Sequence, residues 1–283
     1  MSISVHPFTE TELEATDAVI MAAYQIQHSR EESLRRYLAL QPDGSFVVKH
    51  DGAIVGFGGA MDYGSFAYIG LMAVHPDVQQ HGIGRLVLEQ LLAWLDLRGC
   101  PTVLLDATPV GAALYEHCGF IDDDHTLVLQ RRQSIQLLQH LPQGVSLLSE
   151  QDLPALVAFD TAYFGAERGA LLTSYWADDP SRALVLCDAS GQMTGYLIAQ
   201  PATLGPWVTR TAESAERLLK HALTLPFESE PTVLVSAYHH DALRLLHHYG
   251  FSEQRGLHHM RKGKRVQRGR HTTLYGQASL GFG

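Results

Sequence analysis

Cysteine is scarce in this sequence: three cysteines occur among 283 residues, at positions 100, 118 and 187. An odd number at no ligand-like spacing argues against a disulfide framework and against a zinc site built on thiolates. Uninterrupted apolar runs of about 18 residues, which a membrane-spanning helix needs, are also missing. The first residues show no basic segment followed by an apolar one, so no secretory signal is predicted. We therefore expect a soluble, cytoplasmic protein without a membrane partner.

Positive charge is in short supply as well, with 21 Lys and Arg against 30 Asp and Glu and a formal net charge of -9. Non-specific nucleic-acid binding depends on neutralising phosphates, so no nucleic-acid partner is expected. Six of the basic residues lie in the run RKGKRVQRGR at residues 261–270. Because dense like charge with glycines seldom packs, we predict a solvated loop between two late strands, with an anion or partner contact as the alternative.

What the sequence does contain is a weak internal repeat, and its length allows two domains. A helical pattern ends at Tyr24 and again at Tyr163, and a β-rich pattern places Gly56 against Gly195, both at an offset of 139. Further on, ALYEHCGF is echoed by LRLLHHYGF, where the final phenylalanines are 131 residues apart. The second copy has therefore lost eight residues, at the place where the first copy has a glycine-rich loop.

Each copy predicts the same order of elements: two helices, antiparallel strands, a strand–loop–helix, a strand–helix and final strands. Thr9 with Glu12, and Ser149 with Asp152, are typical of the hydroxyl and carboxylate pairing at a helix start. The polar stretch after residue 131 and the Leu-Pro-Gln-Gly segment that follows it indicate a boundary. We predict a mixed α/β fold with a first domain at residues 1–132, a linker at 133–144 and a second domain at 145–283.

The chemistry concentrates in the loop between a predicted strand at residues 68–74 and a predicted helix at residues 83–97. Gly82 and Gly84 remove two Cβ atoms there, so N–H groups from about Gln80 to Arg85 can converge on one anion. The helix N-terminus adds about half a positive charge, which suits a pyrophosphate. The loop lacks the third glycine of a dinucleotide fingerprint and the Gly-Lys-Ser/Thr of a P-loop.

This segment resembles motif A of the GNAT acetyltransferases, in which Gln/Arg-x-x-Gly-x-Gly/Ala follows a strand ending in Val-x-Pro. Gln79, Gly82 and Gly84 match the signature, and Tyr115 with the Gly119-Phe120 pair resembles motif B. The second half is similar to the diverged module of tandem GNAT proteins of the YitH type. The resemblance implies two tandem GNAT-like domains, each a mixed, mostly antiparallel sheet flanked by helices.

The resemblance also implies an N-acetyltransferase that uses acetyl-CoA as cosubstrate and transfers the acetyl group by direct attack of an amine. The acyl-CoA would lie between two splayed strands, at residues 69–74 and 102–107. Tyr115 would contact the cosubstrate and serve as general acid, its alternative being a core aromatic. The cosubstrate would bind to the main chain of Met72, Ala73 and Val74, one N–H stabilising the carbonyl oxyanion, and to Gln79, Gln80, His81, Gly82, Ile83, Gly84 and Arg85. The chain departs from the family where Gln80-His81 replace an arginine, and where residues 109–111 replace an asparagine that contacts pantetheine.

The general base is not indicated by the sequence. Asp62 is a candidate that could draw in a cationic amine, with a surface-turn aspartate as the alternative, and Asp106 could equally cap a strand end. Asp160 and Arg168 are interpreted as a structural pair. Sixteen histidines include three adjacent pairs, but neighbouring residues point in different directions and rarely chelate one metal, so no metal site is expected.

Two other classes of function remain open: a non-catalytic acyl-CoA sensor, and a scaffold in which both modules only pack. The acceptor could be a small amine, an amino acid, an antibiotic or a protein N-terminus, and the acyl-chain preference and oligomeric state are not indicated. The second copy has no glycine between Gly205 and its helix, carries Glu213 and Glu216 near the helix start, and aligns Leu246 with Tyr115. We therefore expect one acyl-CoA per chain, with the second module walling off the acceptor pocket.

Overall fold

A computed structural model describes residues 2–132 and 144–283, so the predicted linker lies, apart from Gly144, outside the described residues. The first half has α1 (Leu13–Tyr24), α2 (Glu31–Leu40), α3 (Ile83–Leu97), α4 (Pro109–His117), β1 (Ile3–Pro7), β2 (Ser45–His50), β3 (Ala53–Asp62), β4 (Ala67–Val74), β5 (Thr102–Ala107) and β6 (Ile121–Arg131). The second half has α5 (Leu153–Phe164), α6 (Gly169–Asp178), α7 (Ala212–Ala222), α8 (His240–His248), β7 (Val145–Leu147), β8 (Ala183–Cys187), β9 (Met193–Ala199), β10 (Leu204–Thr209), β11 (Thr232–Ser236), β12 (Phe251–Gly263) and β13 (Leu274–Gly276). The mixed α/β class predicted from the sequence is confirmed.

Local signals in the sequence account for the starts of the first helix in each half. Thr9 and Glu12 form a capping box ahead of α1, and Ser149 and Asp152 form one ahead of α5, as predicted. Each box satisfies backbone N–H groups that the first helical turn leaves without a partner. The predicted bounds of α3 and β5 also agree with the structure.

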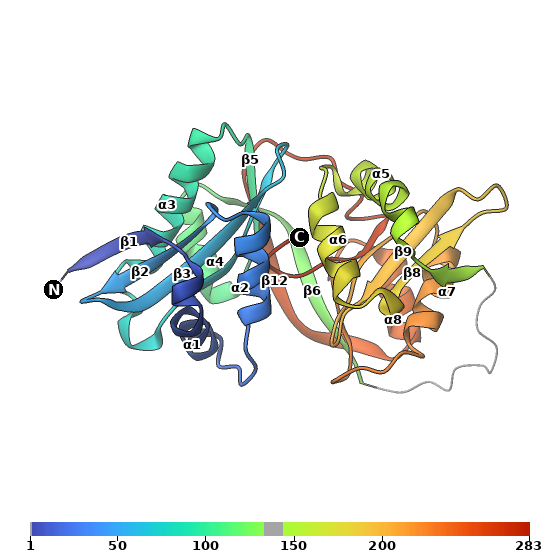
Figure 1. Cartoon of the computed structure of the whole chain (residues 1–283), viewed down its shortest axis with the longest axis horizontal. Helices are drawn as coiled ribbons and strands as arrows, with labels where there is room; N and C mark the ends of the chain where they lie inside the picture. The colour runs from blue at the N-terminus through green and yellow to red at the C-terminus, as the bar shows by residue number, and fades with distance from the viewer. Residues whose placement is uncertain (1, 133–143) are drawn as a thin grey trace.

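The two halves are not separate bodies, because strands from the second half complete the sheet of the first. An eight-stranded sheet runs in the order β1-β2-β3-β4-β5-β12-β6-β11, and a five-stranded sheet in the order β13-β10-β9-β8-β7. Strand β12 pairs antiparallel with both β5 and β6, which are otherwise consecutive strands of the first half. Figure 1 shows β12 and β6 crossing the middle of the molecule between the two groups of helices. The predicted domain ranges therefore stay a prediction, because one sheet contains strands from both predicted domains.

The arrangement of these central strands has an approximate twofold relation. In the repeat, β11 is the counterpart of β5 and β12 is the counterpart of β6. The order β5-β12-β6-β11, with every neighbouring pair antiparallel, therefore reads the same from either end. Each half has exchanged its last long strand with the other half.

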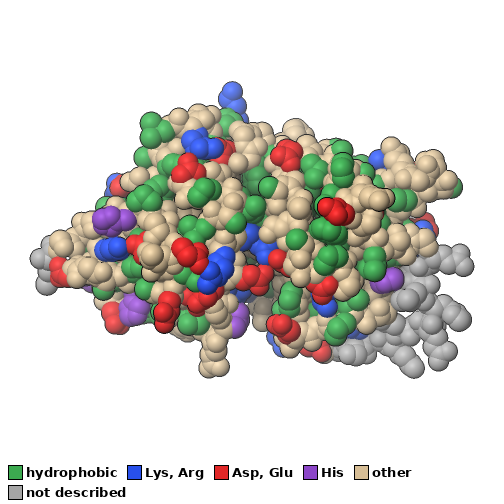
Figure 2. Space-filling view, in the orientation of Figure 1, with side chains coloured by type: hydrophobic (Ala, Val, Ile, Leu, Met, Phe, Trp, Pro, Cys, Tyr) green, Lys and Arg blue, Asp and Glu red, His purple; other side chains and the backbone are tan. Residues whose placement is uncertain are grey.

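Side chains from both halves also share a core. Tyr37 and Met61 of the first half pack in one cluster with Leu172, Tyr196 and Phe282 of the second. At the surface, Arg36 on α2 donates to Asp178 on α6 at 2.7 Å and lies over the Tyr175 ring. Figure 2 shows acidic and basic side chains intermingled over the middle of this face, where α2 and α6 lie side by side in Figure 1. Burial across the boundary makes the halves mutually dependent.

The basic run at residues 261–270 begins within the last three residues of β12 and continues in the segment before β13, and the prediction that it is a solvated loop is wrong at both ends. Arg270 is only 7% exposed, and Arg268 has two terminal nitrogens that solvent does not reach. Carboxylate and aromatic partners from distant strands bury these cations, which composition alone does not indicate. Within residues 2–132 and 144–283, no helix is both long enough and apolar enough to cross a membrane.

Candidate active site

The glycine-rich loop forms an anion cradle made of main-chain groups. After β4, a short 3-10 turn at Pro76–Val78 leads to Gln80 and Gly82, both in the left-handed region with φ of 65° and 80°. The six N–H groups from Gln80 to Arg85 donate to no acceptor within the described residues. Successive N–H groups in such a turn at a helix N-terminus bind anions without needing a lysine.

Side chains of the loop support its shape and do not form the cradle themselves. Gln79 donates through Nε2 to the carbonyl of Val74 at 3.1 Å, and His81 Nδ1 lies 2.8 Å from the carbonyl oxygen of Gln79. The Arg85 side chain donates to Glu89 at 2.7 Å, one helical turn further on. At Gly84 a β-carbon would lie 3.4 Å from Leu114 of α4 and 3.5 Å from Val74, which brings the helix start close to both elements.

Strands β4 and β5 separate beside this loop. Their parallel pairing ends at Ile69 with Leu105, although β4 continues to Val74. A bulge in β4 follows, where Leu71 has a φ of 52° and the register with β3 shifts. Ala73 and Val74 still pair with β3 on one side, whereas the edge of β4 that faces β5 is no longer paired with β5 there. The carbonyls of Met72 and Val74 on this edge accept from side chains instead. The predicted splay between these two strands is therefore present.

Tyr115 lies on α4, which starts at Thr108, whose side chain accepts from the N–H of Gly111. The tyrosine is 8% exposed and packs edge-on against Phe120. Its hydroxyl makes no hydrogen bond within the described part of the chain. Burial raises the pKa of Tyr115 above its usual range. The side chain therefore stays protonated at neutral pH, which a proton donor requires.

The sequence did not single out Tyr24, the last residue of α1. Its hydroxyl donates to the carbonyl of Met72 at 3.1 Å, and, after burial, Tyr24 is the next cause that raises the pKa of Tyr115. At 41% exposed, it lies at the mouth of the splay. The repeat that aligned Tyr24 with Tyr163 carried a signal of this position, but Tyr163 interacts with Arg210 instead.

Asp62 is not brought to this site, and we do not retain it as a base. It pairs with Ala67 at the start of β4, so Met72 is five residues, or roughly 16 Å, further along the strand. Arg98 donates to its carboxylate at 2.7 Å, which gives it a structural role. Asp106 is buried within a polar network with Tyr68, Thr126 and His259, and is no simple strand cap.

The corresponding place in the second half is filled. Strand β13 pairs with β10, and Gln277, which follows β13, donates to the carbonyl of Leu234 on β11. The main-chain groups that the splay leaves open in the first half are thus used in the second.

The helices α7 and α8 of the second half also lack the features of an acyl-CoA site. Thr211 caps α7 by accepting from the N–H of Ser214, and Leu246, opposite Tyr115 in the repeat, is fully buried. A cleft of about 470 Å³ beside α7 and α8 is lined by Ala212, Glu213, Glu216, Asp241, Arg244, Leu245 and His248. Three carboxylates there disfavour a pyrophosphate.

The Asp160–Arg168 pair and the histidine pairs, which the sequence singled out, lie outside this site. Asp160 and Arg168 form a buried two-point ion pair, with distances of 2.8 and 2.9 Å, as interpreted. His258 and His259 point to opposite faces of the sheet, toward Asp122 and Asp106 respectively. Within the described residues, one group of three side chains has the spacing of metal ligands: Asp122, His125 and His258. All three are partly exposed, and His258 Nδ1 already lies 2.8 Å from Asp122.

Comparisons with known proteins match both halves. A family model of the GNAT acetyltransferase family matches residues 11–120, and a GNAT acetyltransferase domain model matches residues 156–276. The uncharacterized N-acetyltransferase YitH of Bacillus subtilis is 28% identical over 176 residues, which cover 59% of this chain. The chain spans 60% of the length of that relative.

The [ribosomal protein bS18]-alanine N-acetyltransferase of Escherichia coli is 32% identical over 120 residues, which cover 40% of this chain and 80% of the E. coli protein. Among solved structures, a candidate acetyltransferase from Pyrococcus horikoshii superposes with a TM-score of 0.86 at 24% identity. That match covers 99% of this chain and 96% of the other, so the whole two-part architecture is shared.

Proposed function

The chain belongs to the GNAT acetyltransferase family, and from this premise we propose that it transfers an acetyl group from acetyl-CoA to the amine of an acceptor. It is an acyltransferase with two GNAT domains in tandem. The proposed site lies in the first half, between the glycine-rich loop, the splayed ends of β4 and β5, and Tyr115. Acetyl-CoA would supply the activated thioester.

The observation that carries this proposal is the row of N–H groups from Gln80 to Arg85, which donate to no acceptor among the described residues, beside an open strand edge. The loop can hold the pyrophosphate through these groups, and residues 72–74 offer main-chain groups to the pantetheine arm. A β-carbon at Gly82 would meet nothing within 4 Å, so the loop leaves space on that side for a phosphate.

Tyr115 is proposed as the group that protonates the departing sulfur. Its buried position keeps the phenol protonated, and its helix packs on β5 next to the splay. Main-chain N–H groups at the bulge of β4 would stabilise charge on the thioester oxygen. The acceptor must arrive as a neutral amine, since an ammonium has no lone pair for attack. No side chain is assigned here as its base.

We propose a primary amine, small or peptidic, as the acceptor class. The E. coli relative, by its name, acts on an alanine of a ribosomal protein, and amine acetylation is the chemistry that both chains would share. The second half is proposed to bind no acyl-CoA and to form a wall of the acceptor pocket, because β13 fills its own splay.

The test compares two asparagine substitutions. Gly52 and Gly82 both have positive φ, of 87° and 80°, and a β-carbon at either would meet nothing within 4 Å. Asparagine tolerates this conformation, whereas a valine would be strained with or without ligand. We expect CoA to raise the melting temperature of the wild type and of Gly52→Asn, and Gly82→Asn to bind CoA at least about tenfold more weakly.

Activity is measured as thiol release from acetyl-CoA with a panel of amines. Equal CoA affinity of Gly82→Asn and wild type would show that the loop assignment is wrong. CoA binding without thiol release for any amine would favour the sensor alternative, and absence of CoA binding by the wild type would favour the scaffold.

A further inference from the structure

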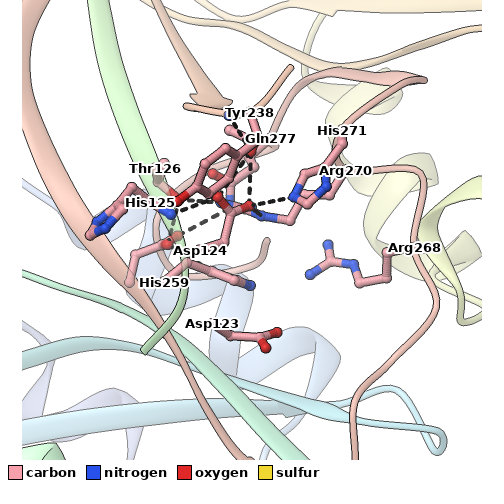
Figure 3. A network of polar contacts seen from close by, with 12 residues as sticks. Asp123, Asp124, His125, Thr126, Tyr238, His259, Arg268, Arg270, His271 and Gln277 are labelled. Carbon is pink, nitrogen blue, oxygen red and sulfur yellow. Dashed lines mark hydrogen bonds and ion pairs between the residues drawn. The ribbon is translucent and has the colours of Figure 1, made fainter. Parts of the chain in front are cut away.

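A cavity that shares no residue with the proposed acyl-CoA site or with the cleft beside α7 and α8 lies on the face of the central strands that carries Leu104 and His259. Its volume is about 220 Å³, smaller than the roughly 300 Å³ at which sites for drug-sized ligands begin. The lining combines three arginines, two histidines and two aspartates with Leu104, Val266 and Gln267: Asp123, Asp124, His259, Arg265, Arg268, Arg270 and His271. Figure 3 shows the charged side chains that it labels converging from strands β6 and β12 and from the segment after β12: Asp123, Asp124, His259, Arg268, Arg270 and His271.

Arg270 is held rigidly at the wall of this cavity. Its Nε donates to Asp124 at 2.7 Å, and its Nη2 donates to Thr126 at 2.6 Å. Arg270 is 7% exposed, and its third nitrogen, Nη1, has no hydrogen bond within the described residues. Asp124 also accepts from Ser236 and lies 3.1 Å from His271, so its charge is fully used by protein partners.

His259 presents a hydrogen-bond acceptor to the same cavity. It is 3% exposed, and its Nδ1 lies 2.9 Å from Asp106. Burial lowers the pKa of His259, and the nearby charge of Arg270 acts in the same direction. The neutral ring therefore donates from Nδ1 to the carboxylate and leaves the Nε2 lone pair free. Figure 3 shows this ring pointing into the space between Asp123 and Arg268.

The surrounding charge favours an anion. Arg268 lies over the rings of Phe66 and Phe164, and its two terminal nitrogens have no hydrogen-bond partner within residues 2–132 and 144–283. It contributes positive potential at the wall, and burial together with Arg270 lowers its pKa to about 10. Asp123 has cationic neighbours already, Arg261 at 3.4 Å and Arg265 at 3.8 Å. Among the described residues, the cavity thus combines a guanidinium nitrogen of Arg270 that makes no hydrogen bond with the Nε2 acceptor of His259.

We propose that this cavity binds a hydrogen phosphate group, with its anionic oxygens on Arg270 and its O–H donated to Nε2 of His259. Both requirements are met by inorganic phosphate and by a singly protonated phosphate monoester. A carboxylate or a sulfate offers anionic oxygens but has no O–H to donate at neutral pH. The ligand class therefore follows from the pairing of a fixed guanidinium with a neutral imidazole.

The test measures binding of inorganic phosphate, sulfate and glycerol phosphate to the full chain by calorimetry at pH 6.5 and constant ionic strength. We expect saturable phosphate binding that is at least about tenfold tighter than sulfate binding, since sulfate leaves the acceptor unpaired. A tighter fit for glycerol phosphate would identify a phosphate monoester as the source of the group, and a weaker fit would identify the free ion.

The matched variants are His259→Asn and His258→Asn. Asparagine at 259 can still donate to Asp106 but removes the second ring nitrogen, whereas His258, on the other face, pairs with Asp122. We expect His259→Asn to bind phosphate and sulfate equally weakly and His258→Asn to behave as wild type. The proposal fails if wild type binds phosphate and sulfate alike, binds neither at millimolar concentration, or is unaffected by His259→Asn. The phosphate-to-sulfate ratio of the wild type decides the matter if the variant does not fold.

Discussion

Tyr115 is a residue at which substrate binding and turnover can be separated. Tyr115→Phe keeps the ring against Phe120 but removes the proton donor. We expect kcat to fall by roughly 10²-fold with CoA affinity nearly unchanged, since a general acid acts on the reacting state and not on binding. Steady-state kinetics and calorimetry measure the two quantities. Tyr238→Phe, at a half-exposed tyrosine of the second half, is the control, and unchanged turnover of Tyr115→Phe at all pH values would remove it from the mechanism.

His239 predicts a pH dependence of stability. It is buried, its Nδ1 accepts from the N–H of Ala242 at the start of α8, and burial lowers its pKa from 6.5 to about 4. Between these values the unfolded chain takes up a proton that the folded chain excludes. The free energy of unfolding should therefore fall as the pH drops from 6.5 toward 4, by at most about 3 kcal/mol from this residue.

His239→Asn tests this dependence, because asparagine can still cap the helix but does not titrate. Denaturant unfolding at pH 7.5 and pH 4.5 gives the loss of stability for each protein. We expect a smaller loss for the variant, whatever its absolute stability. Equal losses in the two proteins would contradict the assignment.

Strand β13 decides how many acyl-CoA molecules one chain binds. It pairs with β10, and the carboxylates of Glu213 and Asp241 line the adjoining cleft. We expect calorimetric titration with CoA to give a stoichiometry of one per chain. A second site of similar affinity would mean that β13 detaches from β10 in solution. Hydrogen exchange tests this independently, because the amides of a detached β13 would lose their protection.

For helices and strands, the sequence predicted the features that depend on neighbouring residues and missed the contacts between residues far apart in the chain. The glycines of the loop, the capping boxes and the bounds of α3 follow from signals within a few residues, and they are found where expected. The sequence predicted final strands in each half but not their neighbours, so the insertion of β12 between β5 and β6 was not predicted. The Asp106–His259 contact joins residues 153 apart in sequence, and it depends on that insertion.

The exchange of β6 and β12 makes the molecule a single folding unit. A fragment of residues 1–132 lacks β12 and β11, so β5 would lose its partner on one edge and β6 would lose its partners on both edges. We expect this fragment not to fold as a monomer, which size-exclusion chromatography and circular dichroism would show. Co-expression with residues 144–283 should recover a soluble complex that binds CoA. A folded, monomeric, CoA-binding fragment of residues 1–132 would refute the dependence.

The position of β12 also has a consequence for synthesis on the ribosome. Strand β6 ends at Arg131 and β12 begins at Phe251, so 119 further residues are made before β12, the strand that pairs with both β5 and β6, starts to appear. At roughly 5–20 residues per second this interval lasts about 6–24 s. During that time the unpaired edges of β5 and β6 in the nascent chain are available to neighbouring nascent chains on the same message. Faster translation of residues 132–263 should therefore reduce misassembly, because the half of the protein that is made first can only be completed by the part that is made last.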